Sequence, residues 1–113
     1  MRTTTTNTAD RDGDDEPSNE PIIVINPTFS LGHVCSTPGV RELLTGGDVT
    51  RLLNRHSRRD WGECYPVDRK SNEHALARGG RVFSTYRMPR DAKVWVITEA
   101  DRSSTTVLLP NEY

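Results

Sequence analysis

The most restrictive feature of this sequence is its first twenty residues, which contain almost no apolar side chain. They consist mainly of Thr, Asp, Asn, Glu and Ser. Such a segment cannot bury enough surface to offset the conformational entropy that ordering costs. We therefore expect a disordered acidic tail over residues 1–20 and one α+β domain over residues 21–113. The tail then increases solubility, or it mimics nucleic-acid charge or folds on a partner.

The net charge has opposite signs in these two parts of the chain. Residues 1–20 carry two basic and six acidic side chains, so 2 − 6 = −4. The whole chain has 15 basic and 16 acidic residues, which leaves 15 − 2 = 13 basic and 16 − 6 = 10 acidic in the body, a net +3. A mildly basic body permits contact with nucleic acid, but a strong DNA binder shows a denser basic face.

The length and the cysteines narrow the class of protein. A chain of 113 residues has the size of one domain. No stretch reaches the roughly 20 apolar residues that cross a bilayer, and the start lacks the pattern of a signal peptide, so we expect a cytoplasmic protein. Cys35 and Cys64 could form at most one disulfide, and we expect both to be buried or unreactive thiols.

The first half of the body predicts one short strand followed by helices. The β-branched run Ile22–Ile25, bounded by prolines, is typical of a strand, whereas residues 29–36 fit a loop or a weak strand. Helix signals follow. The first helix opens at Thr37-Pro38 and ends at Gly46-Gly47, the second is capped by Asp48 and ends near His56, and the third runs from about Asp68 to Gly79.

The last third of the chain predicts a β-meander. Residues 81–87 and 93–98 form a hairpin across the turn 88–91, and residues 105–109 form a further strand. The run Val94–Ile97 is apolar on both sides, so we expect it at the centre of the sheet. The predicted fold is an antiparallel sheet of three to four strands with two or three short helices packed on one face.

A polar turn between the last two expected strands is the first candidate site. Arg102 can pair with Glu99 or Asp101 while hydroxyls cap backbone groups, so the turn can be purely structural. The functional alternative is a recognition edge at which Trp61 or Trp95 adds an aromatic anchor, although Trp95 also suits the core. The candidate binding residues are Asp60, Trp61, Glu99, Asp101 and Arg102.

Basic residues around the loop that contains Trp61 form the alternative, a nucleic-acid site. Arginine and lysine supply the salt-sensitive part of nucleic-acid affinity. Three acidic residues in the same stretch favour an ordinary mixed-charge surface instead. The candidate nucleic-acid residues are Arg55, Arg58, Arg59, Arg69 and Lys70.

The sequence holds no complete catalytic or metal-binding pattern. Its histidines and cysteines lack the paired spacings of a zinc site, so we expect no metal and no cofactor. The strand followed by Asn26-Pro27 and an aromatic residue is similar to an element of amino-methyltransferases, but the glycine-rich loop that holds the methyl donor is missing. Acidic residues near Lys93 have the types found in nucleases but no diagnostic order.

The segment from about Leu31 to Tyr113 resembles a family of small uncharacterised proteins from bacterial plasmids and integrated elements. The resemblance rests on Thr37-Pro38-Gly39, Asp60-Trp61-Gly62, the run from Trp95 to Arg102 and the run from Thr105 to Pro110. Some members carry the label of a type I restriction endonuclease subunit M, which the missing methyl-donor loop does not support. The resemblance implies cargo of mobile DNA and assigns no catalytic role to any residue.

From these observations we expect a non-enzymatic protein-binding module of mobile-element origin. Its expected partner is a host defence protein, for example a restriction or CRISPR-type complex that it inhibits. One alternative is a small nucleic-acid-acting enzyme or toxin, which predicts growth arrest that is lost when Glu99 or Asp101 is replaced. The other is a weak DNA-binding regulator, whose gel shifts would weaken steeply with salt.

Overall fold

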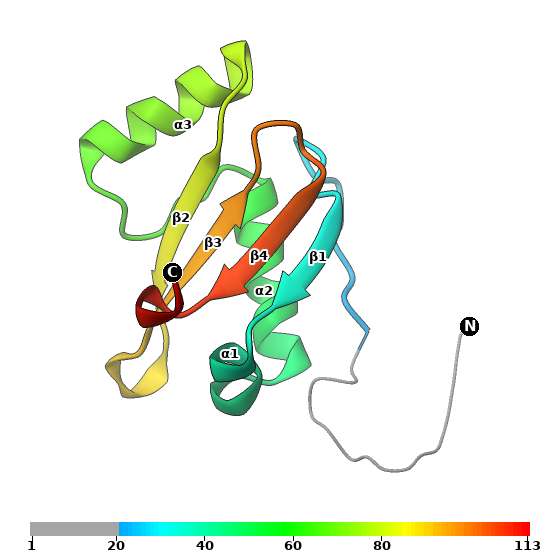
Figure 1. Cartoon of the computed structure of the whole chain (residues 1–113), viewed down its shortest axis with the longest axis vertical. Helices are drawn as coiled ribbons and strands as arrows, with labels where there is room; N and C mark the ends of the chain where they lie inside the picture. The colour runs from blue at the N-terminus through cyan, green and yellow to red at the C-terminus, as the bar shows by residue number, and fades with distance from the viewer. Residues whose placement is uncertain (1–20) are drawn as a thin grey trace.

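The computed structural model describes residues 21–113, so the expected disorder of residues 1–20 lies outside the described part of the chain. The elements form an α+β fold in which one strand precedes three helices and three strands follow them (Figure 1). In chain order they are β1 (His33–Ser36), α1 (Pro38–Leu43), α2 (Gly46–Ser57), α3 (Pro66–Arg78), β2 (Val82–Arg87), η2 (Pro89–Asp91), β3 (Lys93–Thr98), β4 (Ser104–Leu108) and η3 (Pro110–Glu112).

The sheet is mixed, which corrects the expected antiparallel sheet. Its strand order is β1-β4-β3-β2, and β1 runs parallel to β4 while the other neighbours are antiparallel. Short turns join β2 to β3 and β3 to β4, so their pairing follows from the sequence. The three helices that connect β1 to β2 free β1 from any hairpin, and it joins the edge beside β4. The prediction that Val94–Ile97 is central is confirmed, because β3 lies between β4 and β2.

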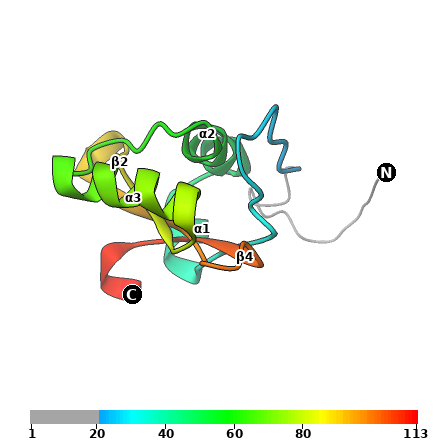
Figure 2. The same cartoon turned by 90° about the horizontal axis from the view of Figure 1, so that it is seen from above.

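The core lies between the sheet and α2. Figure 2 shows α2 and α3 on the same side of the sheet. Val94 and Val96 of β3 and Val107 of β4 are fully buried against Leu53 of α2 and Val40 of α1. Their alternation along the strands directs one face of the sheet to this core.

The opposite face of the sheet carries an aromatic cluster. The rings of Phe83 and Trp95 meet edge to face at 5.1 Å, and those of Trp95 and Tyr113 meet at 5.8 Å. The C-terminal turn lies on this side of the sheet (Figure 2). Trp95, which we expected in the core, is therefore half-buried on the outer face.

The helix starts follow capping chemistry, with one correction. Thr37 accepts a hydrogen bond from the Val40 N–H, as predicted for α1. The second helix is capped by Thr45 and not by Asp48, which instead completes the capping box from the third helical position. Gly46-Gly47 consequently opens α2 and does not end α1, because the Thr45 side chain before it accepts from the Asp48 N–H.

The run Ile22–Ile25 belongs to no strand, so the predicted strand is wrong. The Asn54 side chain of α2 donates to the Ile23 carbonyl at 2.8 Å and accepts from the Ile25 N–H at 2.8 Å. Arg58 donates to the Ile25 carbonyl at 2.6 Å. The side chains of Asn54 in α2 and of Arg58 directly after it thus bond to backbone groups that we expected to be paired in a β-sheet.

The third helix begins at Pro66, two residues before the predicted start, and it has only a weak apolar stripe. Asn72 and Ala75 are its buried residues. The Asn72 side chain accepts from the Phe83 N–H at 2.9 Å and donates to the Phe83 carbonyl at 2.6 Å. This amide holds α3 against β2 in place of a large apolar face.

Candidate functional site

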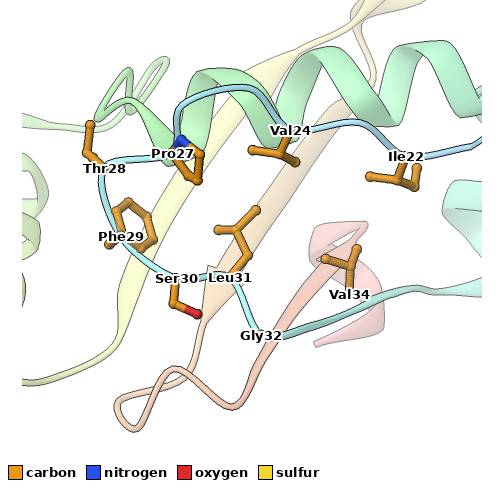
Figure 3. A pocket seen from close by; sticks show the side chains of 9 residues that line it. All are labelled: Ile22, Val24, Pro27, Thr28, Phe29, Ser30, Leu31, Gly32 and Val34. Atoms are coloured by element: carbon orange, nitrogen blue, oxygen red, sulfur yellow. The ribbon is translucent and has the colours of Figure 1, made fainter.

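An open apolar groove lies between the segment that precedes β1 and β1 itself. Its volume is about 650 Å³. Figure 3 shows its side chains on two arms of the chain, one passing along α2 and the other entering β1. The apolar residues that line it are Ile22, Val24, Phe29, Leu31 and Val34.

Two positive backbone angles shape this U-turn of the chain. Asn26 has a φ of 52° before Pro27, where the first arm ends. Gly32 has a φ of 63°, and a Cβ atom at this position would overlap the backbone of Ser103. The second arm therefore approaches the β3–β4 turn as closely as only glycine permits.

The β1 side of the groove is a free strand edge. The His33 N–H donates to the Ser103 carbonyl at 2.9 Å, and the Thr37 N–H donates to the Val107 carbonyl at 3.1 Å. Because backbone groups alternate along a strand, those of Val34 and Ser36 point away from β4. Within residues 21–113 no strand pairs with this edge.

The run that supplies one wall of the groove exposes three isoleucine side chains, of which Ile22 lines the groove. Ile22, Ile23 and Ile25 have exposed fractions of 40%, 56% and 55%. The sequence predicts this run as a strand, in which apolar side chains are usually buried, so it does not predict their exposure to solvent. Contiguous exposed apolar surface of this kind is typical of an interaction site.

The structure places Trp61 in the core and not on a recognition edge. Its exposed fraction is 3%, its indole N–H donates to Glu73 at 3.1 Å, and its ring packs against Phe29 and His56. Asp60 beside it accepts two hydrogen bonds from Arg55, and this guanidinium lowers the pKa of the Asp60 carboxyl. Both side chains brace the loop before α3.

The polar turn between β3 and β4 is held by Arg102. Its guanidinium donates to the carbonyl oxygens of Gly80 at 2.7 Å, Glu99 at 2.9 Å and Ala75 at 3.2 Å, which ties the turn to the end of α3. Asp101 accepts from the Ser103 N–H at 2.9 Å. The turn is therefore self-contained, although Arg102 bonds carbonyl groups where we expected a carboxylate partner.

None of the five candidate binding residues lines the groove. Glu99 forms an ion pair with Arg81 at 3.3 Å. Arg102 and Trp61 both approach the ring of Phe29, at 5.9 and 6.2 Å from its centroid. Phe29, which lines the groove, is thus in contact with two of the candidate residues. Direct binding of a ligand by the five residues stays a prediction.

Four of the five candidate nucleic-acid residues make contacts inside the molecule. Arg55 pairs with Asp60, and Arg59 pairs with Glu73 at 3.1 Å. Arg58 donates to the Ile25 carbonyl, whereas Arg69 donates to the Cys64 and Gly62 carbonyls. Lys70 is exposed. These side chains organise α2 and the following loop, and nucleic-acid binding by them stays a prediction.

A buried chain of hydrogen bonds contains a serine and a histidine. Ser84 Oγ lies 2.5 Å from His56 Nδ1, and both residues have exposed fractions of 0%. Burial, followed by the charge of Arg102, lowers the pKa of His56 to about 3. The pair has the side chains of a nucleophile and a base, but no substrate in solvent reaches it.

The remaining chemistry-bearing side chains of residues 21–113 are scattered. No group of three or more His, Cys, Asp or Glu residues in this part could hold a metal ion. Cys35 is exposed and Cys64 is buried, and burial raises the pKa of the Cys64 thiol. No helix within the same residues is long and apolar enough to span a membrane.

Comparison of the chain with protein-family models, with curated proteins and with solved structures gives no match. The sequence alone does not predict the groove, because it places Ile22 and Val24 in a strand and Leu31 and Val34 in a loop or weak strand. The signal that could have found it is the Asn26-Pro27 turn between two short apolar runs.

Proposed function

We propose that this chain is a non-enzymatic protein-binding module whose binding site is the groove between residues 22–31 and β1. One observation carries the proposal, namely that an open apolar groove lies directly beside a strand edge with free backbone groups. Apolar surface supplies affinity, and backbone donors and acceptors supply orientation. This pairing suits a polypeptide ligand better than a small polar substrate.

The distribution of charged side chains supports a binding role. Many acids and arginines of the described residues are used in pairs such as Arg55–Asp60, Arg59–Glu73 and Arg87–Glu63. The groove itself is lined by apolar and small polar residues. General acid–base or phosphoryl chemistry requires ionisable groups aimed at one point, and the groove supplies surface for packing instead.

The resemblance to plasmid-encoded proteins supplies the context of the proposal. A small mobile-element protein that binds another protein through an apolar groove is suited to blocking a host defence complex of the restriction or CRISPR type. The partner in this proposal is a protein of such a complex, which the chain inhibits by occupying its surface.

Affinity purification from a bacterial lysate tests the proposal. The tagged full chain should recover a protein partner in stoichiometric amount, and Ile22→Glu should lower the recovery at least tenfold, because it places a charge in the groove. Ile23→Glu is the control, since Ile23 has a similar exposed fraction and does not line the groove.

Two results would reverse the proposal. The first is equal recovery by both glutamate variants, which would move the binding site away from the groove. The second is recovery of no partner together with turnover on nucleic acid or growth arrest that depends on Glu99 or Asp101. The nucleic-acid-acting enzyme would then become the better account.

A further inference from the structure

The free edge of β1 presents backbone hydrogen-bonding groups in a defined pattern. The N–H and C=O of Val34 and the N–H of Ser36 point away from β4, because residues 33 and 37 bond towards it. The Ser36 carbonyl accepts a hydrogen bond from Arg41 at 2.7 Å. The edge therefore has two donors and one acceptor free of partners within residues 21–113, enough to align one short extended segment.

The groove lies where alternate side chains of such a segment would fall. Val34 is an edge residue and also lines the groove, with Val24 and Leu31 beside it (Figure 3). In a strand added to β1, every second side chain would point to the same face as Val34. The groove would receive these side chains, so the segment needs apolar residues at alternate positions.

Three arginines contact β1 or the segment that precedes it. Arg41 donates to the Ser36 carbonyl, Arg58 to the Ile25 carbonyl, and Arg102 lies over the ring of Phe29. Within residues 21–113 each of the three bonds to carbonyl oxygens and forms no ion pair.

Three carboxylates lie beside β1 or beside these arginines. Glu42 and Asp101 adjoin Arg41 and Arg102 in sequence, and Asp101 accepts from the Ser103 N–H. Glu112 accepts from the Thr37 hydroxyl and the Gly39 N–H, directly after β1. Three acidic groups thus balance three guanidinium groups, so charge does not select the ligand and the edge and the groove do.

We infer that the partner adds an extended segment, with apolar residues at alternate positions, as a fifth strand on the free edge of β1. The inference rests on the proposed function and names the chemistry of the ligand for the same groove. Residues 1–20 of the chain are almost devoid of apolar side chains, so they do not match the groove. A second copy of the chain offers its own β1 edge, and slow amide exchange in the free chain would reveal that pairing.

Selection of peptides on the full chain tests the inference. The probe is a random heptapeptide library displayed on phage and selected against the immobilised protein. Enriched peptides should carry apolar residues at alternate positions. Each synthetic peptide should slow amide hydrogen exchange at Val34 and Ser36 at least tenfold, while exchange in α3 stays unchanged.

A proline variant separates the backbone edge from the groove. Val34→Pro removes an outward N–H and no bond to β4, and proline is tolerated on edge strands. It should weaken peptide binding at least tenfold, whereas Val34→Thr keeps the N–H and should weaken it less. If Val34→Pro does not fold, exchange at Val34 and Ser36 in the wild-type chain decides the question alone.

Several outcomes would overturn strand addition. These are failure to enrich any peptide, enriched peptides without alternation, and unchanged exchange at Val34 and Ser36 on binding. Slow exchange of these amides in the free chain would also do so, because residues 1–20 or a second copy would then occupy the edge. If Ile22→Glu abolishes capture of the protein partner while edge exchange is unaffected, the proposed function stands and the strand addition fails.

Discussion

His56 Nε2 lies 2.9 Å from Thr98 Oγ1, and both side chains are fully buried. The direction of each hydrogen bond follows from the end of the chain of bonds. Thr105 donates to the Leu31 carbonyl at 2.7 Å, so its oxygen accepts from Thr98 at 2.7 Å. Thr98 must then accept from His56 Nε2–H, and Ser84 donates to Nδ1. Every polar group is satisfied only by a neutral imidazole.

This relationship predicts that the protein loses stability in mild acid. The pKa of His56 is about 3 in the folded chain against 6.5 for a free histidine, so only the unfolded chain gains this proton between those values. The contribution is fully present above pH 6.5 and is lost as the pH falls below it. The free energy of unfolding should be about 2 kcal/mol lower at pH 5 than at pH 7.

Urea unfolding at the two pH values measures this loss. His74 is exposed on α3, so His74→Gln should retain the pH dependence. His56→Gln should lower the stability at pH 7 and remove most of the difference between pH 7 and pH 5. A wild-type chain that is equally stable at both values would contradict the buried neutral histidine.

Removal of the Thr105 hydroxyl should destabilise the fold. Thr105→Val keeps the shape but leaves the Leu31 carbonyl without its donor and Thr98 without its acceptor. The expected cost is about 1–3 kcal/mol, the range for a buried polar group left unpaired. Thr106→Val on the outer face of β4 is the control and should change the free energy of unfolding by less than about 0.5 kcal/mol. Equal effects of the two substitutions would argue against the buried chain.

Gly62 should tolerate no side chain. Its φ is +71°, and a Cβ atom would overlap the carbonyl oxygen of Thr85, with which this loop forms an isolated bridge. Gly79 also has a positive φ, of +93°, but its Cβ would meet nothing within 4 Å. Gly79→Ala should therefore cost about 1 kcal/mol, from backbone strain alone. Gly62→Ala should cost at least about 2 kcal/mol more, measured by thermal unfolding, and similar values for both would exclude the clash.

The two cysteines should react at very different rates in the native protein. Cys35 is exposed on β1, whereas Cys64 is buried, donates to the Phe83 carbonyl at 3.4 Å and has a raised pKa because of burial. The thiolate is the reactive form, so a disulfide reagent at pH 8 should titrate one thiol rapidly. The second should react only after denaturation, with Cys35→Ser as the control that removes the fast phase. Fast reaction of both thiols would show that the loop before α3 opens readily.

The sequence determined those parts of the fold whose signals lie within a few residues. Thr37-Pro38 opened a helix, and the apolar run Val94–Ile97 became the central strand. The hairpin of β2 and β3 followed because one short turn joins two β-branched segments. Helix caps, turns and strand propensity depend on residues that are close in the sequence, so these elements can be predicted without knowing the rest of the chain.

The tertiary structure alone decided the elements whose partners lie far away in the sequence. β1 pairs with β4, and the run Ile22–Ile25 bonds to Asn54 and Arg58. The residues next to each segment in the sequence do not predict these contacts. Arg102 was expected to pair with a carboxylate and instead collects carbonyl groups from α3 and the neighbouring turn. The groove arises from these long-range contacts, because hydrogen bonds are satisfied by whichever group the packed chain brings within reach.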